Sequence, residues 1–248
     1  MKRSFRPTIY AQAAVLAVML ASSAAVASAN GGGPATPNFQ GTFSLFDAAQ
    51  NVVGGLFPGI TAVDLTSVPC NLTGPPNTTI GNCAPPAAAP PYNVTDSGIT
   101  WTPAKNHAPT LSQLKTLSAA YNVDATDCGG GSPRFLIVLS GGSFLTGYFG
   151  PPPSFTGCPV GWQNTGNFVD PSDPTARWAV GNSGAYQPYA TASAGLGGQQ
   201  ITEIDIVVDG GWFPALNPPA STHAGQDVTI DNFTVNNQVM HLPLPANF

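Results

Sequence analysis

Hydrophobic and polar positions alternate with a period of two in the second half of the chain, the pattern of half-buried β-strands. The clearest case is residues 201–209 (ITEIDIVVD), where isoleucine and valine side chains share one face. Glu203, Asp205, Val207 and Asp209 fall on the opposite face. We therefore predict a strand here with one core face and one polar, solvent-exposed face, as in an edge-type strand.

Two further segments predict strands with different surroundings. Residues 135–139 (FLIVL) are apolar at every position, so this strand should be central and covered on both faces. Residues 228–235 begin with Val228 and Ile230 pointing inward, and the pattern then changes phase at Asp231-Asn232. A β-bulge at that point would restore the register.

The rest of the chain reads as short strands and turns. From Phe39 onward, apolar runs alternate with clusters of Gly, Pro, Asn and Asp, and 28 glycines and 26 prolines leave little room for long helices. One short helical turn is predicted where Thr110 and Gln113 fit a capping box. The predicted fold class is an all-β antiparallel sandwich with one or two short helical turns, forming a single domain over residues 39–248.

The first 29 residues have the layout of a secretory signal. Basic residues precede an apolar run over residues 11–26, and Ala27 and Ala29 stand where signal peptidase requires small side chains. The run is short for a membrane-spanning helix, which needs about 20 apolar residues; a retained anchor is the alternative. We predict cleavage after Ala29, a flexible leader at 30–38, no membrane span, and a secreted or surface location, with the periplasm as an alternative.

The charge balance excludes one class of partner. The whole chain carries 7 basic and 12 acidic residues, and three of the basic ones lie in the signal, which leaves a mature charge of −8. Such a surface is unsuited to nucleic acid, which is bound through Lys and Arg. Only 8% of residues are charged, against about 25% in typical domains, so Thr, Ser, Asn, Gln and Gly must supply the polar surface.

Four cysteines in an exported chain predict disulfides. Three pairings are open; Cys70–Cys83 and Cys128–Cys158 are favoured because each pair would close a Gly/Pro-rich loop. A metal site is the weaker interpretation, because no C-x-x-C spacing or histidine pair accompanies them.

Four segments carry a family resemblance: 110–121 (TLSQLKTLSAAY), 131–139 (GSPRFLIVL), 201–212 (ITEIDIVVDGGW) and 228–236 (VTIDNFTVN). In this order they resemble jelly-roll modules of bacterial extracellular proteins, of the galactose-binding or carbohydrate-binding-module type. The resemblance covers about half of the chain, and it implies jelly-roll topology and an extracellular location. Residues 39–100 show no such likeness.

Sugar binding would depend on aromatic rings, since sugars lay their C–H faces on Trp and Tyr. Five rings in polar, loop-like surroundings are candidates for binding a polysaccharide or a cell-surface glycan: Trp212, Trp162, Trp178, Tyr186 and Tyr189. Each of them could equally be a core residue, because sandwich cores absorb several aromatic side chains.

Two carboxylates are candidates for a structural calcium ion, the resemblance implying a hard cation with oxygen ligands. They are Asp209, at a strand end, and Asp231, beside the expected bulge. The alternative is that both cap turns by accepting backbone amides, and no Asp-rich calcium loop is present.

Catalysis finds little support, and no catalytic residue is assigned. There is no G-x-S-x-G motif, and the three histidines share no metal-ligand spacing. Glu203 and Asp205 could form an acid pair, although solvated strand residues are the simpler interpretation. The sequence thus favours a secreted, non-catalytic carbohydrate- or surface-binding module. A structural cell-surface or matrix protein and a glycan hydrolase or lyase are the alternatives.

Overall fold

The structure is a computed structural model, and the part of the chain that it describes comprises residues 39–47, 49–56, 61–67, 69–70, 93–94, 96–123, 128, 132–181, 183–209 and 226–244. These residues all belong to one compact unit, Thr36–Phe248. The predicted signal at 1–29 and the leader at 30–38 lie outside the described residues.

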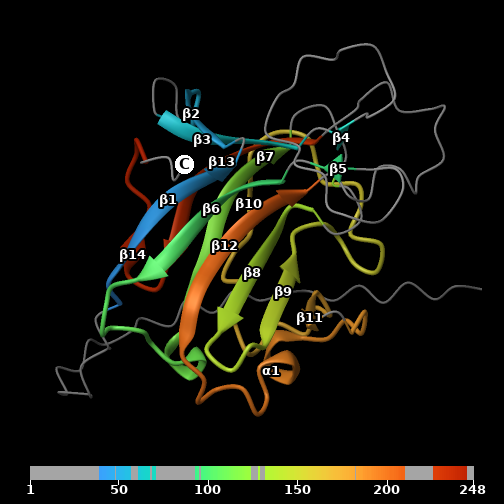
Figure 1. Cartoon of the computed structure of the whole chain (residues 1–248). Helices are drawn as coiled ribbons and strands as arrows, with labels where there is room; N and C mark the ends of the chain where they lie inside the picture. Colours follow the sequence, from blue (N-terminus) through green and yellow to red (C-terminus); the bar gives the residue numbers. More distant parts are fainter. Residues whose placement is uncertain are drawn as a thin grey trace, which may run out of the picture. The chain divides into compact units, whose positions relative to one another are not determined.

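Two antiparallel sheets pack face to face, which confirms the predicted sandwich (Figure 1). Sheet A runs in the order β1 (Gly41–Asp47), β6 (Asp96–Pro103), β12 (Ile201–Asp209), β8 (Arg134–Leu139), β9 (Phe144–Tyr148) and β11 (Trp178–Val180). Sheet B runs in the order β10 (Gln163–Asn164), β7 (Leu117–Val123), β13 (Gln226–Val235), β3 (Thr61–Ser67) and β2 (Gln50–Val53), with β14 (Gln238–Val239) paired to β13. A separate two-stranded ladder joins β4 (Pro69–Cys70) and β5 (Asn93–Val94).

The strand order is compatible with a jelly roll. When β3, β6, β7, β8, β9, β10, β12 and β13 are counted in chain order from one to eight, sheet B reads 1-8-3-6 and sheet A reads 2-7-4-5. Successive strands then alternate between the two sheets, apart from the β8–β9 hairpin. Two interlocked Greek keys produce such an order. Strands β1, β2 and β11 extend the edges.

The core lies between the sheets and follows the predicted alternation. On β12, Ile204 and Ile206 are fully buried, and Phe135 and Ile137 of β8 lie beside them. The phase change in β13 is a bulge, as predicted, because the register with β7 shifts between Asp231 and Thr234. The bulge keeps the apolar residues on both of its sides in the core.

Two strands differ from their predicted surroundings. Residues 135–139 alternate between buried and half-buried side chains, so only one face of β8 is covered completely. Strand β12 is not an edge strand, because it pairs with β6 on one side and with β8 on the other. This central position changes the environment of its polar face, as described below.

Short helical turns stand at the end of the sandwich. The 3₁₀ helix η1 (Leu111–Gln113) is the predicted turn, and the Gln113 side chain accepts a hydrogen bond from the Thr110 amide at 2.8 Å. The four-residue α1 (Tyr189–Ala192) follows Pro188. Among the described residues, neither helix has the length and hydropathy to cross a bilayer.

One predicted disulfide is present. Cys128, which follows β7, is bonded to Cys158 in the segment between β9 and β10, with the Cα atoms 5.2 Å apart. Both residues are buried, so the bond fixes two long connections to the core. The second predicted pair lies outside the described residues, since Cys83 and the side chain of Cys70 are not part of them.

Candidate functional site

The outer face of sheet A carries a row of polar side chains across neighbouring strands. The register aligns four polar residues, Ser44 of β1, Thr100 of β6, Asp205 of β12 and Thr146 of β9, and Leu136 of β8 interrupts the row between the last two. Thr100 is half-buried, whereas the other three polar side chains are 3–8% exposed. Because strands lie about 4.8 Å apart, the row extends for roughly 19 Å. In Figure 1 the strands of this sheet lie in front of β7 and β13, with the outer face toward the viewer.

A pair of carboxyl groups lies at the centre of this row. Asp205 is 3% exposed, and Glu203, two residues earlier on the same face, is half-buried. The two side chains are hydrogen-bonded to each other, and Thr100 also bonds to the Asp205 carboxyl group. Within the part of the chain that the structure describes, Oδ1 of Asp205 is buried and has no hydrogen-bond partner.

This environment holds a proton on Asp205. Burial is the largest cause, and the hydrogen bond and charge of Glu203 add to it, so the pKa of Asp205 rises to about 8. The hydrogen bond with Thr100 acts in the opposite direction but is outweighed. Asp205 thus keeps its proton to a higher pH than an exposed carboxyl group does.

Aromatic rings form a cluster on the same face. Tyr148 of β9 stacks on Phe155 with ring centroids 4.7 Å apart, and Tyr186 meets both rings edge-on at 5.4 and 4.5 Å. Tyr148 is paired across the strands with Arg134 of β8. Tyr186 is 40% exposed, so this cluster, the Tyr186 cluster, presents an accessible ring at the surface.

The Tyr186 cluster lies close to the carboxyl pair. Tyr148 lies on β9, two strands away from β12, and it is the next outward-facing residue after Thr146 of the polar row. With strands about 4.8 Å apart, the lateral distance between the two features is about 10 Å. A ligand two or three sugar rings long could touch both.

The five predicted aromatic residues have different positions. Tyr186 is exposed and Trp162 is half-buried, so both can contribute to a surface. Trp178 is 1% exposed and Tyr189 is 7% exposed, and their rings contact each other at 5.3 Å inside the molecule. Trp212 lies outside the described residues.

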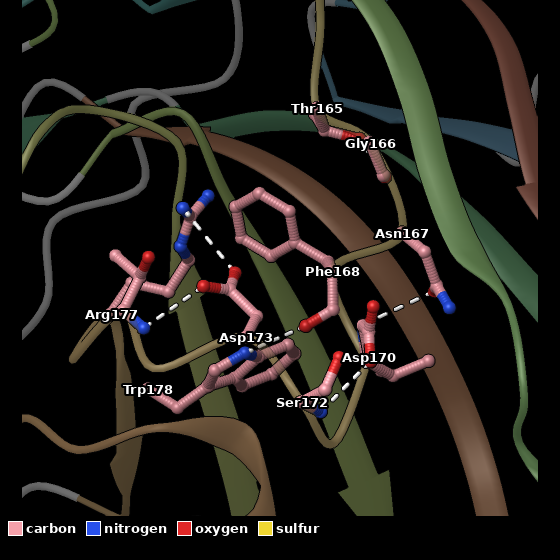
Figure 2. A network of polar contacts seen from close by, with 11 residues as sticks. Thr165, Gly166, Asn167, Phe168, Asp170, Ser172, Asp173, Arg177 and Trp178 are labelled. Carbon is pink, nitrogen blue, oxygen red and sulfur yellow. Dashed lines mark hydrogen bonds and ion pairs between the residues drawn. The ribbon is translucent and has the colours of Figure 1, made fainter. Parts of the chain in front are cut away.

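A network of contacts in the segment before β11 explains the burial of Trp178 (Figure 2). The indole N–H of Trp178 donates to the Phe168 carbonyl at 3.0 Å, and the guanidinium of Arg177 lies 4.6 Å from the centroid of the Phe168 ring. Asp173 is ion-paired with Arg177 at 3.5 Å. The segment is therefore held against the core, with the indole as part of that core.

Of the two predicted calcium ligands, only Asp231 has a side chain among the described residues. Asp231 accepts the Leu56 amide at Oδ2 and the Asn232 amide at Oδ1, at 3.0 and 2.7 Å, as a turn-capping residue does. The backbone of Asp209 ends β12, and its side chain lies outside the described residues. Across the described part of the chain, no three His, Cys, Asp or Glu side chains come together in a way that could hold a metal ion.

Several residues of the candidate site carried no signal in the sequence. Thr100 and Thr146 are ordinary strand threonines, and Phe155 stands in a proline-rich stretch with a backbone φ of +55°. Tyr148 could have been placed from alternation with Phe144 and Thr146 on the same face. Which rings would meet there depends on contacts between distant segments.

Comparison with known proteins adds no family to this description. No family model, no curated protein and no solved structure matches the chain. The geometry of the outer face of sheet A therefore provides the basis for a functional proposal.

Proposed function

We propose that this chain is an exported, non-catalytic jelly-roll module that binds a polysaccharide or cell-surface glycan across the outer face of sheet A. The observation that carries the proposal is the combination of an exposed ring cluster and a polar row on one sheet face. A sugar has matching features: its apolar C–H face can stack on an aromatic ring, and its hydroxyl groups can form hydrogen bonds with polar side chains.

The polar row supplies complementary hydrogen-bonding groups. Glu203 and Thr100 are half-buried, so their oxygens are the groups of the row that a sugar hydroxyl can reach. Asp205 is 3% exposed and bonded to Glu203, so it positions the Glu203 carboxyl group and does not contact the ligand. The Tyr186 ring supplies a stacking surface about two sugar units away. The low number of charged residues in the chain also fits a ligand recognised through hydroxyls and ring faces.

The test is a polysaccharide array probed with the exported protein and two variants of one residue. Tyr186→Ala removes the exposed ring and is expected to lower the affinity at least tenfold. Tyr186→Phe keeps the ring, and should bind within about twofold of the original protein. Circular dichroism confirms that both variants are folded.

Two outcomes would contradict the proposal. If the original protein binds no glycan, the structural cell-surface interpretation takes its place. If Tyr186→Ala binds as well as the original protein, the Tyr186 cluster is not the binding surface.

A glycan hydrolase is the second candidate, favoured by one observation: the pKa of Asp205 is raised to about 8, as a general acid requires. Against it, glycosidase carboxyl groups are separated by about 5–5.5 Å or about 6.5–9.5 Å, whereas Glu203 and Asp205 are hydrogen-bonded directly. The test is to incubate the protein with a glycan and measure the release of reducing ends. Release that Glu203→Gln abolishes would support the hydrolase and contradict the non-catalytic binding module.

A further inference from the structure

A separate cavity of about 360 Å³ opens at the end of the sandwich, where η1, α1 and the segments around residues 169–171 and 195–197 meet. Its lining includes the apolar residues Leu111, Leu114 and Val169, which are 1–3% exposed, and the polar residues Lys115 and Tyr189. No residue of the polar row or of the Tyr186 cluster lines it. It is therefore distinct from the proposed glycan surface.

Hydrogen bonds hold the walls of the cavity in place. The amide of Ser112 donates to the Gly197 carbonyl and that of Leu111 to the Gln199 carbonyl, both at 2.9 Å. These bonds tie η1 to the segment after α1. On the other side, Tyr189 packs on the buried Trp178. The cavity is thus formed before any ligand arrives, as small-molecule sites usually are.

Lys115 brings a positive charge to the rim of the cavity. Its amide donates to Oδ1 of Asn236 at 2.6 Å, and its carbonyl accepts from Nδ2 of Asn167 at 2.9 Å. Both backbone groups are therefore fixed while the side chain is exposed. Among the described residues, Lys115 has no acidic partner, and no Asp or Glu lines the cavity.

One acidic residue, Asp170, stands beside the cavity lining in the sequence and is hydrogen-bonded locally. Asp170, next to the lining residue Pro171, accepts hydrogen bonds from the Ser172 amide and hydroxyl at 2.8 and 2.7 Å. These bonds hold the pKa of Asp170 below its ordinary value. In the described part of the chain, Asp170 forms no ion pair with Lys115. The ammonium group is thus available to an anion from outside.

We propose that this cavity binds a small carboxylate with an apolar body, the body lying on Leu111, Leu114 and Val169 and the carboxylate meeting Lys115. The volume is sufficient, since a cavity of about 150 Å³ already holds benzene. Tyr189 also lines the cavity, and its hydroxyl is a hydrogen-bond donor. Burial raises the pKa of Tyr189 to about 12, so the hydroxyl keeps its proton at any working pH.

The experiment compares three probes with one tail and different head groups: octanoate, 1-octanol and octylammonium. Binding to the exported protein is followed by NMR titration of the amides of residues 111–115 and 193–197. Octanoate is expected to bind at least fivefold more tightly than octanol, and octylammonium more weakly than either. Raising the salt concentration should reduce the octanoate affinity alone.

Three variants assign the site. Lys115→Met should lower octanoate affinity about fivefold and leave octanol unchanged, whereas Lys105→Met, at an exposed lysine outside the cavity lining, should change neither. Gly197→Leu should weaken octanoate and octanol alike, because a side chain there meets Ser112, its Cβ lying 3.4 Å from that of Ser112. A folded spectrum for each variant accompanies the titration.

The proposal is overturned if no probe shifts the cavity amides, if octanoate and octanol bind equally, or if Lys115→Met binds octanoate as the original protein does. None of these outcomes bears on glycan binding, which is measured through Tyr186 on the outer face of sheet A.

Discussion

A carboxyl group that is buried next to another carboxyl group keeps its proton far above the pH at which an exposed one ionises. Asp205 has a pKa of about 8 in the folded chain and about 3.9 in an unfolded one. Between these values the folded state binds one more proton than the unfolded state. The free energy of unfolding therefore falls as the pH rises from about 4 to about 8, and this contribution is complete below pH 4.

Replacing Asp205 with asparagine tests this directly. The amide cannot ionise, yet it can still donate to Glu203, so the variant should lack the loss of stability between pH 4 and pH 8. A rise of the Asp205 pKa from about 3.9 to about 8 corresponds to about 5 kcal/mol. For the original protein we therefore expect the melting temperature to fall by on the order of 10–20 °C over that range, at about 2–4 °C per kcal/mol. Thermal unfolding followed by circular dichroism at half-unit pH steps measures both curves.

Asp173 provides the control, because its ionisation changes the free energy of unfolding in a different pH range. Burial raises the pKa of Asp173, but hydrogen bonds with Thr175 and the charge of Arg177 outweigh this effect and hold the pKa below its ordinary value. Its contribution is lost as the pH falls below about 4. Asp173→Asn should leave the slope between pH 4 and 8 unchanged. Parallel curves for Asp205→Asn and the original protein would refute the assignment.

At the scale of elements, side-chain contacts (Figure 2) add to the backbone hydrogen bonds that hold the segment from β10 to β11, such as that from the Phe168 amide to the Leu117 carbonyl at 2.8 Å. Arg177 lies against the Phe168 ring and pairs with Asp173, with both charged side chains partly exposed. Exposed ion pairs contribute about 0.2–1 kcal/mol, and a cation on a ring adds about 0.5–1 kcal/mol. The larger part of the effect should come from the packing of Arg177 on the core.

A double-mutant cycle separates the two contributions. In urea unfolding, Arg177→Met is expected to cost about 1–2 kcal/mol and Asp173→Asn less than about 1 kcal/mol. Their coupling should be about 0.5 kcal/mol and should shrink in 1 M salt, since salt screens the ion pair. A coupling that is absent at low salt would mean that the ion pair does not stabilise the segment.

The elements that the sequence predicted well are those whose pattern is local. Alternation located β12 and the phase change located the bulge in β13, because each depends on neighbouring side chains. The central position of β12 was missed, since it depends on pairing with β6, about a hundred residues earlier. That pairing converts a predicted solvent-exposed Asp205 into a buried acid.

The candidate site was predictable only in part for the same reason. Tyr186 was a candidate by residue type, and its ring is accessible. Trp178 was a candidate by the same criterion, and contacts with Phe168 and Tyr189 place it in the core. Residue type and local polarity do not distinguish these two cases, because burial of a ring is decided by which distant segments pack on it.

At the scale of the whole molecule, the few charged residues are placed unevenly. The described carboxyl pair lies on the outer face of sheet A, whereas Lys115 stands at the end of the sandwich beside the cavity. With 8% charged residues, each isolated charge has few competitors nearby. The two proposed ligands, a largely uncharged glycan and a small anion, can therefore bind at separate surfaces of the same molecule.

The proposed location in the cell can be tested on the whole chain. Expressed with its own N-terminus in a bacterium, the protein is expected outside the cytoplasm with Asn30 as its first residue, because Ala27 and Ala29 suit signal peptidase. Intact mass and N-terminal sequencing check the cleavage. Ala29→Arg puts a long charged side chain at the cleavage site and should leave the leader attached.

The oxidation state of the cysteines provides an independent measurement on the same sample. An oxidising compartment should yield no alkylation of Cys128 or Cys158 before reduction, and reduction should destabilise the fold by about 2–4 kcal/mol, since the bond closes a loop of 30 residues. Cytoplasmic protein with an intact leader and free thiols would contradict export. The glycan and carboxylate proposals would then still be tested by their own variants, because neither binding surface includes the leader or the disulfide.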